Sequence, residues 1–153
     1  MEEYKKVINN IKKKINSDTN FSNNDFFEQL KLIQKNILQS LDINVTSILI
    51  NNKKNIFINL DKMAILTLNY LASSTDISKI QIINNNKDLF ERKNNDYGSS
   101  YKDFALLGLI VRINDKINRF LNIQNKNTMV DEDKYETIND LYNYCIISLI
   151  YSY

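Results

Sequence analysis

The sequence predicts a mainly α-helical protein with one short β-hairpin. Over most of the chain, apolar residues recur every three to four positions, which is the period of an amphipathic helix. Polar segments such as NSDTNFSNND at 16–25 interrupt that period. No segment has the composition of a linker rich in Pro, Gly or Ser, and no internal repeat is present. These observations favour helices joined by short polar connections.

Two helices are predicted in the first 41 residues, over 1–17 and 25–41. In each of them, apolar side chains at helical spacing fall on one face, which we expect to lie in the core. The residues expected to face inward are Tyr4, Val7, Ile8, Ile11 and Ile15 in the first helix and Phe26, Phe27, Leu30, Ile33, Ile37 and Leu41 in the second.

The hairpin is predicted within residues 44–60. Two runs rich in β-branched residues flank the polar NNKK at 51–54, which suggests a turn between two strands. An irregular connection is the alternative. Residues 61–73 then have the length and apolar body of a helix. A further helix is favoured for residues 77–95, where the helical period runs through Ile80, Ile83, Lys87 and Phe90.

The C-terminal part is predicted to form two longer helices. Gly98 gives a turn its conformational freedom, and Ser100 with Asp103 forms an S-x-x-D capping box before a helix at 101–123. Asp133 and Glu136 repeat that pattern as D-x-x-E before a last helix at 134–152. The residues expected to be buried are Leu106, Leu107, Ile110, Ile113, Ile117, Phe120, Ile138, Leu141, Tyr142, Cys145, Ile146 and Leu149.

Composition excludes several classes of function. Histidine is absent, so His-dependent triads, His metal sites and His general bases are ruled out. The single cysteine, Cys145, excludes a Cys-rich zinc site and an internal disulfide. The 20 basic and 18 acidic residues nearly balance, which gives no argument for a nucleic-acid partner. Any catalysis must then use carboxylates, Lys, Arg, Tyr or Ser/Thr, with a hard metal ion such as Mg²⁺.

The compartment is expected to be the cytoplasm. The longest apolar runs, such as FALLGLIV at 104–111, are far too short to span a bilayer. The N-terminus MEEYKKVINNIKKK has no apolar signal core. We therefore expect no membrane partner. A small helical domain with several apolar faces also favours a homo-oligomer.

Charged residues form a stripe on each of the two C-terminal helices. On the first, four charges stand at spacing i, i+3, i+4 and i+7, and on the second a polar face lies away from the apolar one. If the helices pack antiparallel, carboxylates from both approach one another, which is how a helical bundle builds a Mg²⁺ site. The basic residues would then contact phosphate. The stripes consist of Arg112, Asp115, Lys116 and Arg119, and of Glu136, Asp140, Asn143 and Tyr144.

An ordinary solvated surface is the competing interpretation of these stripes. Charges at i, i+3 and i+4 on a helix usually form weak pairs in water. Glu136 is also explained as part of a helix cap, and an acid in the first turn suits the helix dipole. Tyr144 fits the boundary between core and surface. Spacing alone leaves both interpretations open.

Four short motifs inside residues 93–150 resemble one known family. They are KNNDYG at 93–98, GLIVRINDKINR at 108–119, DE at 131–132 and DLYNY at 140–144. In order and spacing they are similar to the nucleotide modification-associated domain type 1 family, which is common in phages and their hosts. The resemblance divides the chain into an N-terminal helical region of unknown role at 1–75 and a nucleotide modification-associated domain at 76–153.

The resemblance implies a MazG-like helical bundle, related to the all-α nucleoside triphosphate pyrophosphatases. Those enzymes hold Mg²⁺ between acidic pairs on two helices and release pyrophosphate from nucleotides. Carried over, Asp115, Glu136 and Asp140 would be the catalytic and metal-binding acids. Asp96, Tyr97 and Arg112 fall on the family's own motif. Together with Lys116, Arg119 and Tyr144, they are the candidate ligand-binding residues.

The chain departs from the enzyme pattern in both acidic pairs. Arg112 stands where the first acid of a Glu-x-x-Glu pair would be, and Glu136-x-x-Asn139 replaces Glu-x-x-Asp, with the acid moved to Asp140. Three functions therefore stay open. The protein is a Mg²⁺-dependent pyrophosphohydrolase of phage nucleotide metabolism, a non-catalytic module that binds or sequesters a modified or signalling nucleotide, or a structural helical interaction protein.

Overall fold

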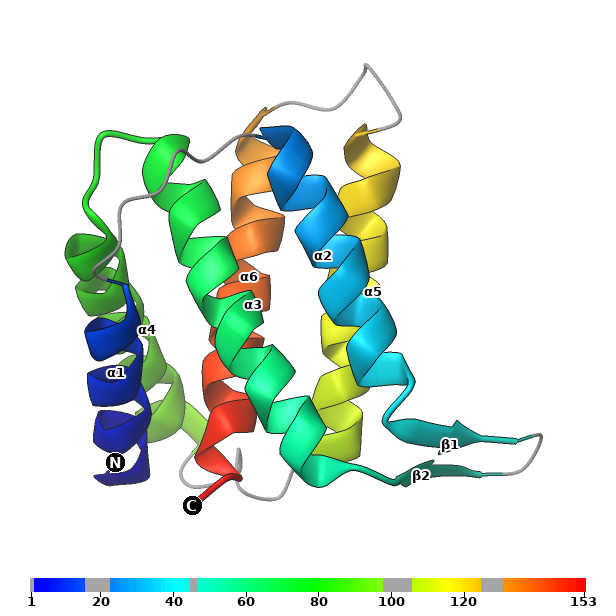
Figure 1. Ribbon diagram of the computed structural model, residues 1–153. Coiled ribbons are helices and arrows are strands. Elements are labelled where there is room, and N and C mark those ends of the chain that lie inside the picture. The colour runs from blue at the N-terminus through cyan, green and yellow to red at the C-terminus, as the bar shows by residue number, and fades with distance from the viewer. Residues whose placement is uncertain (1, 16–22, 45–46, 98–105, 125–130) are drawn as a thin grey trace.

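A computed structural model describes residues 2–15, 23–44, 47–97, 106–124 and 131–153. It confirms the predicted fold class, because the described part is mainly helical with a short antiparallel hairpin (Figure 1). Among the described helices, none is long and apolar enough to cross a membrane. The elements are α1 (Glu2–Lys14), α2 (Asn23–Leu38), β1 (Leu41–Ile43), β2 (Ile48–Ile50), α3 (Lys53–Ser73), α4 (Lys79–Tyr97), α5 (Leu106–Gln124) and α6 (Asp131–Ile150).

Four of the helices form a closed bundle. Helix α2 contacts α3, α3 contacts α6, α6 contacts α5, and α5 contacts α2. Neighbours in this ring run antiparallel, as Figure 1 shows. Helices α1 and α4 lie against the α3 and α6 side of the ring, where α1 contacts both and α4 contacts α3. One cluster of buried side chains draws on residues 1–75 and on residues 76–153. The domain boundary between them stays a prediction.

The predicted inward faces form most of that core. All predicted core positions of the last helix are buried, and those of the first two helices are buried or packed against the core. Two positions differ. Leu107 is only partly buried, and Ile80 is exposed while Ile82 and Asn86 face inward. In α4, helical spacing fits more than one face, and the neighbouring helices decide which face is covered.

Aromatic rings connect three helices of the bundle. Phe26 and Phe27 of α2, Tyr70 of α3 and Phe120 of α5 pack at centroid distances of 4.6–6.1 Å. Phe26 meets Phe120 edge to face at 5.4 Å, and both are fully buried. Offset and edge-to-face pairs of this kind add stability beyond the area that they bury. Phe120 contacts all three other rings.

The hairpin exists, but its predicted position was wrong. The two strands are Leu41–Ile43 and Ile48–Ile50 rather than two runs on either side of residues 51–54. The turn is closed by Asn44, whose side-chain Oδ1 accepts a hydrogen bond from the Ser47 amide at 2.9 Å. Predicted strand residues 55–60 are instead the first turns of α3.

The polar NNKK segment starts a helix for a clear physical reason. Asn52 is the N-cap of α3, and its side chain accepts a hydrogen bond from the Asn55 amide at 3.1 Å. Asparagine is among the best residues for this position, because it satisfies an amide that the helix leaves unpaired. From there, Ile56 and Leu60, four residues apart, are both fully buried. The residues at 51–54 that suggested a turn therefore lead into a helix of 21 residues.

One predicted helix start was also wrong. Helix α6 begins at Asp131, so Asp133 lies inside its first turn and is not the N-cap. The predicted turn at Gly98 and the capping box of Ser100 and Asp103 lie outside the described residues.

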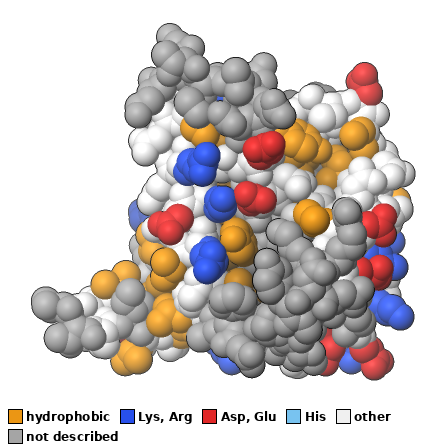
Figure 2. Space-filling model, turned by 180° about the vertical axis from the view of Figure 1, so that it is seen from behind, with side chains coloured by type: hydrophobic (Ala, Val, Ile, Leu, Met, Phe, Trp, Pro, Cys, Tyr) orange, Lys and Arg blue, Asp and Glu red, His pale blue; other side chains and the backbone are white. Residues whose placement is uncertain are grey.

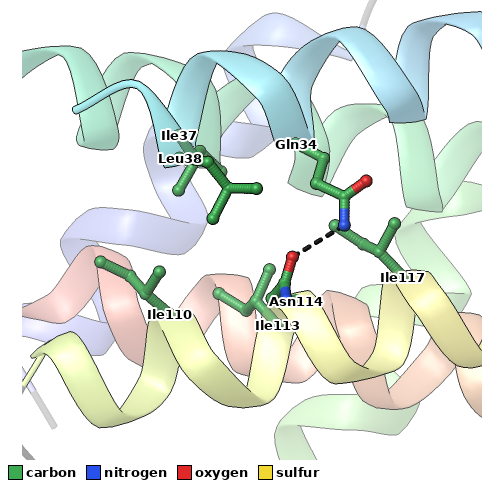
Figure 3. A pocket seen from close by; sticks show the side chains of 7 residues that line it. All are labelled: Gln34, Ile37, Leu38, Ile110, Ile113, Asn114 and Ile117. Atoms are coloured by element: carbon green, nitrogen blue, oxygen red, sulfur yellow. Dashed lines mark hydrogen bonds between the residues drawn. The ribbon is translucent and has the colours of Figure 1, made fainter. Parts of the chain in front are cut away.

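Polar side chains tie α2 to α5 and α3. Gln34 of α2 donates through Nε2 to Oδ1 of Asn114 at 2.7 Å and of Asn118 at 2.9 Å, both on α5. Asn55 of α3 donates to Ser40 Oγ at 2.7 Å, just after α2. A small cleft of about 10 Å³ lies beside the Gln34–Asn114 bond (Figure 3). Such a space holds about one water molecule, so it is too small for a nucleotide.

Removal of the Tyr142 hydroxyl is expected to stabilise the protein. Tyr142 is 1% exposed, and its hydroxyl has no hydrogen-bond partner among the described residues. Burial also raises the pKa of this phenol, so it stays neutral. Because an unpaired buried hydroxyl costs about 1–3 kcal/mol, Tyr142→Phe should raise the free energy of unfolding by about 1 kcal/mol. Urea denaturation measures this, with Tyr153→Phe as the surface control, where the hydroxyl accepts an exposed 3.5 Å hydrogen bond from Asn10. A destabilised Tyr142→Phe variant would contradict the expectation.

Candidate functional site

The predicted site residues of α5 and α6 lie on the outer side of the bundle. Seen from behind, basic and acidic side chains are interspersed on this face (Figure 2). Helix α5 turns Ile113 and Ile117 into the core and leaves the opposite side for charged residues. We call the following set the charged stripe: Arg112, Asp115, Lys116 and Arg119 of α5 with Glu136 and Asp140 of α6. Lys116 and Asp140 are partly buried, and the other four residues are exposed.

An ion pair between the two helices lies in the charged stripe. The Lys116 ammonium donates to Asp140 Oδ2 at 3.0 Å. The Lys116 side chain is 23% exposed and the Asp140 side chain is 49% exposed. Helices α5 and α6 do pack antiparallel, as the site hypothesis required (Figure 1). Because water screens a half-exposed pair, its contribution to stability is about 0–1 kcal/mol.

The described side chains do not fit the Mg²⁺ site that the resemblance implies. Among them, no three His, Cys, Asp or Glu groups are placed to hold a metal ion, and Asp115, Glu136 and Asp140 all belong to the described part. Asp140 is already bonded to a cation. The structure thus brings Asp140 together with Lys116 and does not assemble the three acids. Magnesium binding stays a prediction.

The departure at Asn139 has a structural explanation. Asn139 faces α4, where it exchanges two hydrogen bonds with Asn86. Asn86 Nδ2 donates to Asn139 Oδ1 at 3.0 Å, and Asn139 Nδ2 donates to Asn86 Oδ1 at 3.1 Å. Asn143 Nδ2 also donates to Asn86 Oδ1 at 2.8 Å. Asn86 is only 5% exposed, so these bonds satisfy a buried amide. The position that would carry an acid in the enzymes therefore joins α6 to α4.

The sequence pattern did not predict this cluster of Asn86, Asn139 and Asn143. It expected Asn143 to share one polar face with Asp140, but α6 turns Asn143 toward α4 and Asp140 toward α5. The signal that was available is the i, i+4 spacing of two asparagines. In a chain so rich in asparagine, that spacing alone does not distinguish a buried amide from an exposed one.

The remaining candidates are Asp96, Tyr97 and Tyr144. Asp96 and Tyr97 are the last residues of α4, and their side chains lie outside the described part. Tyr144 is half-buried and packs against the core cluster, in agreement with a boundary aromatic. Cys145 is fully buried, and burial raises the pKa of its thiol, so it is no candidate nucleophile.

The charged stripe presents groups that are chemically complementary to a ligand with both negative charge and polar hydrogens. Arg112 and Arg119 present planar guanidinium groups, which match two phosphate oxygens at once. Asp115 and Glu136 present exposed carboxylates, which accept hydrogen bonds from hydroxyl or amino groups.

Comparison with known proteins gives one family. No curated protein and no solved structure matches the chain. Residues 93–151, which run from the end of α4 through α5 and α6, match the family described as Nucleotide modification associated domain 1. The match contains the whole charged stripe and agrees with the resemblance seen in the motifs. Residues 93–151 are therefore similar to the Nucleotide modification associated domain 1 family.

Proposed function

We propose that the charged stripe binds the phosphate groups of a nucleotide or nucleotide derivative, and that this is a binding site rather than a strongly hydrolytic one. The observation that carries the proposal is the Lys116–Asp140 pair inside the family match. The α6 acid that a metal would need is bonded to a cation, and Arg112 stands one helical turn before Lys116. This arrangement supports electrostatic binding of an anion more than metal chemistry.

The spacing of the basic residues supports contact with more than one phosphate. Arg112 and Arg119 are seven residues apart on α5, which is roughly 10 Å along a helix. Lys116 lies between them along α5. A phosphate that bonds to the Lys116 ammonium would replace Asp140 as its partner. The carboxylates of Asp115 and Glu136 would favour a ligand that also carries sugar hydroxyls over inorganic phosphate.

The direction in which one substitution changes nucleotide affinity separates binding from metal-dependent hydrolysis. Asp140→Asn removes a carboxylate that competes for Lys116, so metal-free affinity for a nucleotide should rise. The gain should be about 0.2–1 kcal/mol, up to roughly fivefold, because the pair is half-exposed. Calorimetric titration in EDTA measures it, with Asp42→Asn on β1 as a control that removes an equal charge outside the charged stripe. A loss of affinity specific to Asp140→Asn would contradict the proposal.

Mg²⁺-dependent hydrolysis of nucleoside triphosphates, which the resemblance implies, is tested in parallel. A pyrophosphate-release assay on the unsubstituted protein, with and without Mg²⁺, should show slow or no turnover. Brisk Mg²⁺-dependent release, abolished by Asp140→Asn, would establish the enzyme instead. If the protein binds no nucleotide with or without Mg²⁺, the proposal is contradicted and the structural helical interaction protein is the function that stays open.

A further inference from the structure

The hairpin of β1 and β2 carries the two most exposed large apolar side chains of the described structure. Ile43 is 61% exposed and Leu49 is 60% exposed. The hairpin projects beyond the helices, as Figure 1 shows. At its base, Leu41 and Ile50 pack against the core. A two-stranded hairpin is marginally stable in water by itself, so an exposed leucine at the centre of β2 is better explained by a partner.

The ladder shows which backbone groups of β2 are available to a partner. Asn44 donates its amide to the Ser47 carbonyl at 2.9 Å, which makes 44 and 47 a hydrogen-bonded pair. In an antiparallel ladder, hydrogen-bonded and non-bonded pairs alternate. Asp42 and Leu49 are therefore bonded to each other, and the amides and carbonyls of Ile48 and Ile50 point away from β1.

Charge distinguishes the two edges of this sheet. From Ser47 to Asn52, β2 and its flanks carry no charged residue. The edge of β1 carries Asp42 at its centre. If two copies paired through β1, their Asp42 side chains would stand opposite each other, which is unfavourable. Within residues 47–52, pairing of two copies through β2 brings no like charges together. Exposed edges that avoid association usually carry Lys or Pro, and β2 has neither.

We propose that the chain forms a two-fold dimer in which β2 pairs antiparallel with β2 of a second copy, centred on Leu49. In that register Ile48 of one copy lies opposite Ile50 of the other, and their outward backbone groups form hydrogen bonds on both sides of the axis. The two Leu49 residues form a non-bonded pair, in which side chains lie closest. The result is a four-stranded sheet with its two Leu49 side chains in contact.

The mass of the protein in solution tests the dimer. Sedimentation equilibrium at micromolar concentration should give twice the 18.0 kDa of one chain. Leu49→Lys places two ammonium groups at the axis and should return the mass to 18.0 kDa. Ile43→Lys, equally exposed but on β1, is the matched control and should leave the dimer intact. A monomeric parent, or a dimer insensitive to Leu49→Lys, would overturn the proposal.

Cross-linking tests the register without weakening the interface. Leu49→Cys should form an intermolecular disulfide under mild oxidation, because the paired residues meet at the axis within disulfide range. Ile43→Cys is the matched control and should link far less. The native Cys145 is fully buried and should contribute nothing. Cross-linking that is equal at both positions, or absent at Leu49, would show that the copies do not pair through β2.

Discussion

Phe120→Ala is expected to lower the free energy of unfolding by about 3–5 kcal/mol, the range for buried phenylalanine. Phe120 is fully buried and contacts Phe26 and Phe27 of α2 and Tyr70 of α3. Its loss removes apolar contacts and leaves a cavity where three helices meet, which rigid helices fill only in part. Urea denaturation followed by circular dichroism measures the effect.

A matched control separates this packing from the helical propensity of α5. Val111→Ala lies on the same helix, but Val111 is 47% exposed, so its stability should change by no more than about 0.5 kcal/mol. A loss below about 1 kcal/mol for Phe120→Ala would mean that the three helices do not meet around this ring.

Arg112→Ala is expected to weaken nucleotide binding by about 1.5–3 kcal/mol, the range for hydrogen bonds to charged groups. That loss is roughly a tenfold to 150-fold rise in Kd. The reason is that Arg112, on the exposed side of α5, lies one turn from Lys116 and can bond two phosphate oxygens at once. Titration calorimetry in metal-free buffer measures the change.

Lys35→Ala is the control for the loss of one positive charge. Lys35 is exposed on α2, outside the family match. Its removal should change the Kd little, because Lys35 is outside the charged stripe and salt screens the field of an exposed charge. Equal losses in both variants would indicate attraction by net charge and no specific phosphate contact at Arg112.

Periodicity predicted the helices well because burial itself has the helical period. The apolar positions of α6 that were predicted to be buried, between Ile138 and Leu149, lie on one side of the helix, and the bundle covers that side. Boundaries were less predictable, because asparagine and lysine suit both a turn and a helix start. Only the Asn52 side chain, bonded to the Asn55 amide, decides that α3 begins there.

The charged stripe could be predicted from spacing and motif, but its pairing could not. Spacing places Lys116 and Asp140 on outward faces of two helices, and only the packing of α5 on α6 decides that they meet. The same holds for Asn139, whose role depends on α4, an element about fifty residues earlier in the chain. When the packing of two helices decides which side chains meet, the spacing of residues within one helix does not reveal the pair.

Calorimetric titration of the unsubstituted protein in EDTA, with nucleoside mono-, di- and triphosphates, tests the central claim most directly. We predict saturable binding of at least one nucleotide without metal, weakened by added salt because the contacts are electrostatic. We also predict that inorganic phosphate binds less tightly, since it offers nothing to Asp115 and Glu136. Binding that occurs only after Mg²⁺ is added, or no binding of any nucleotide, would contradict the assignment of the charged stripe as a phosphate-binding site.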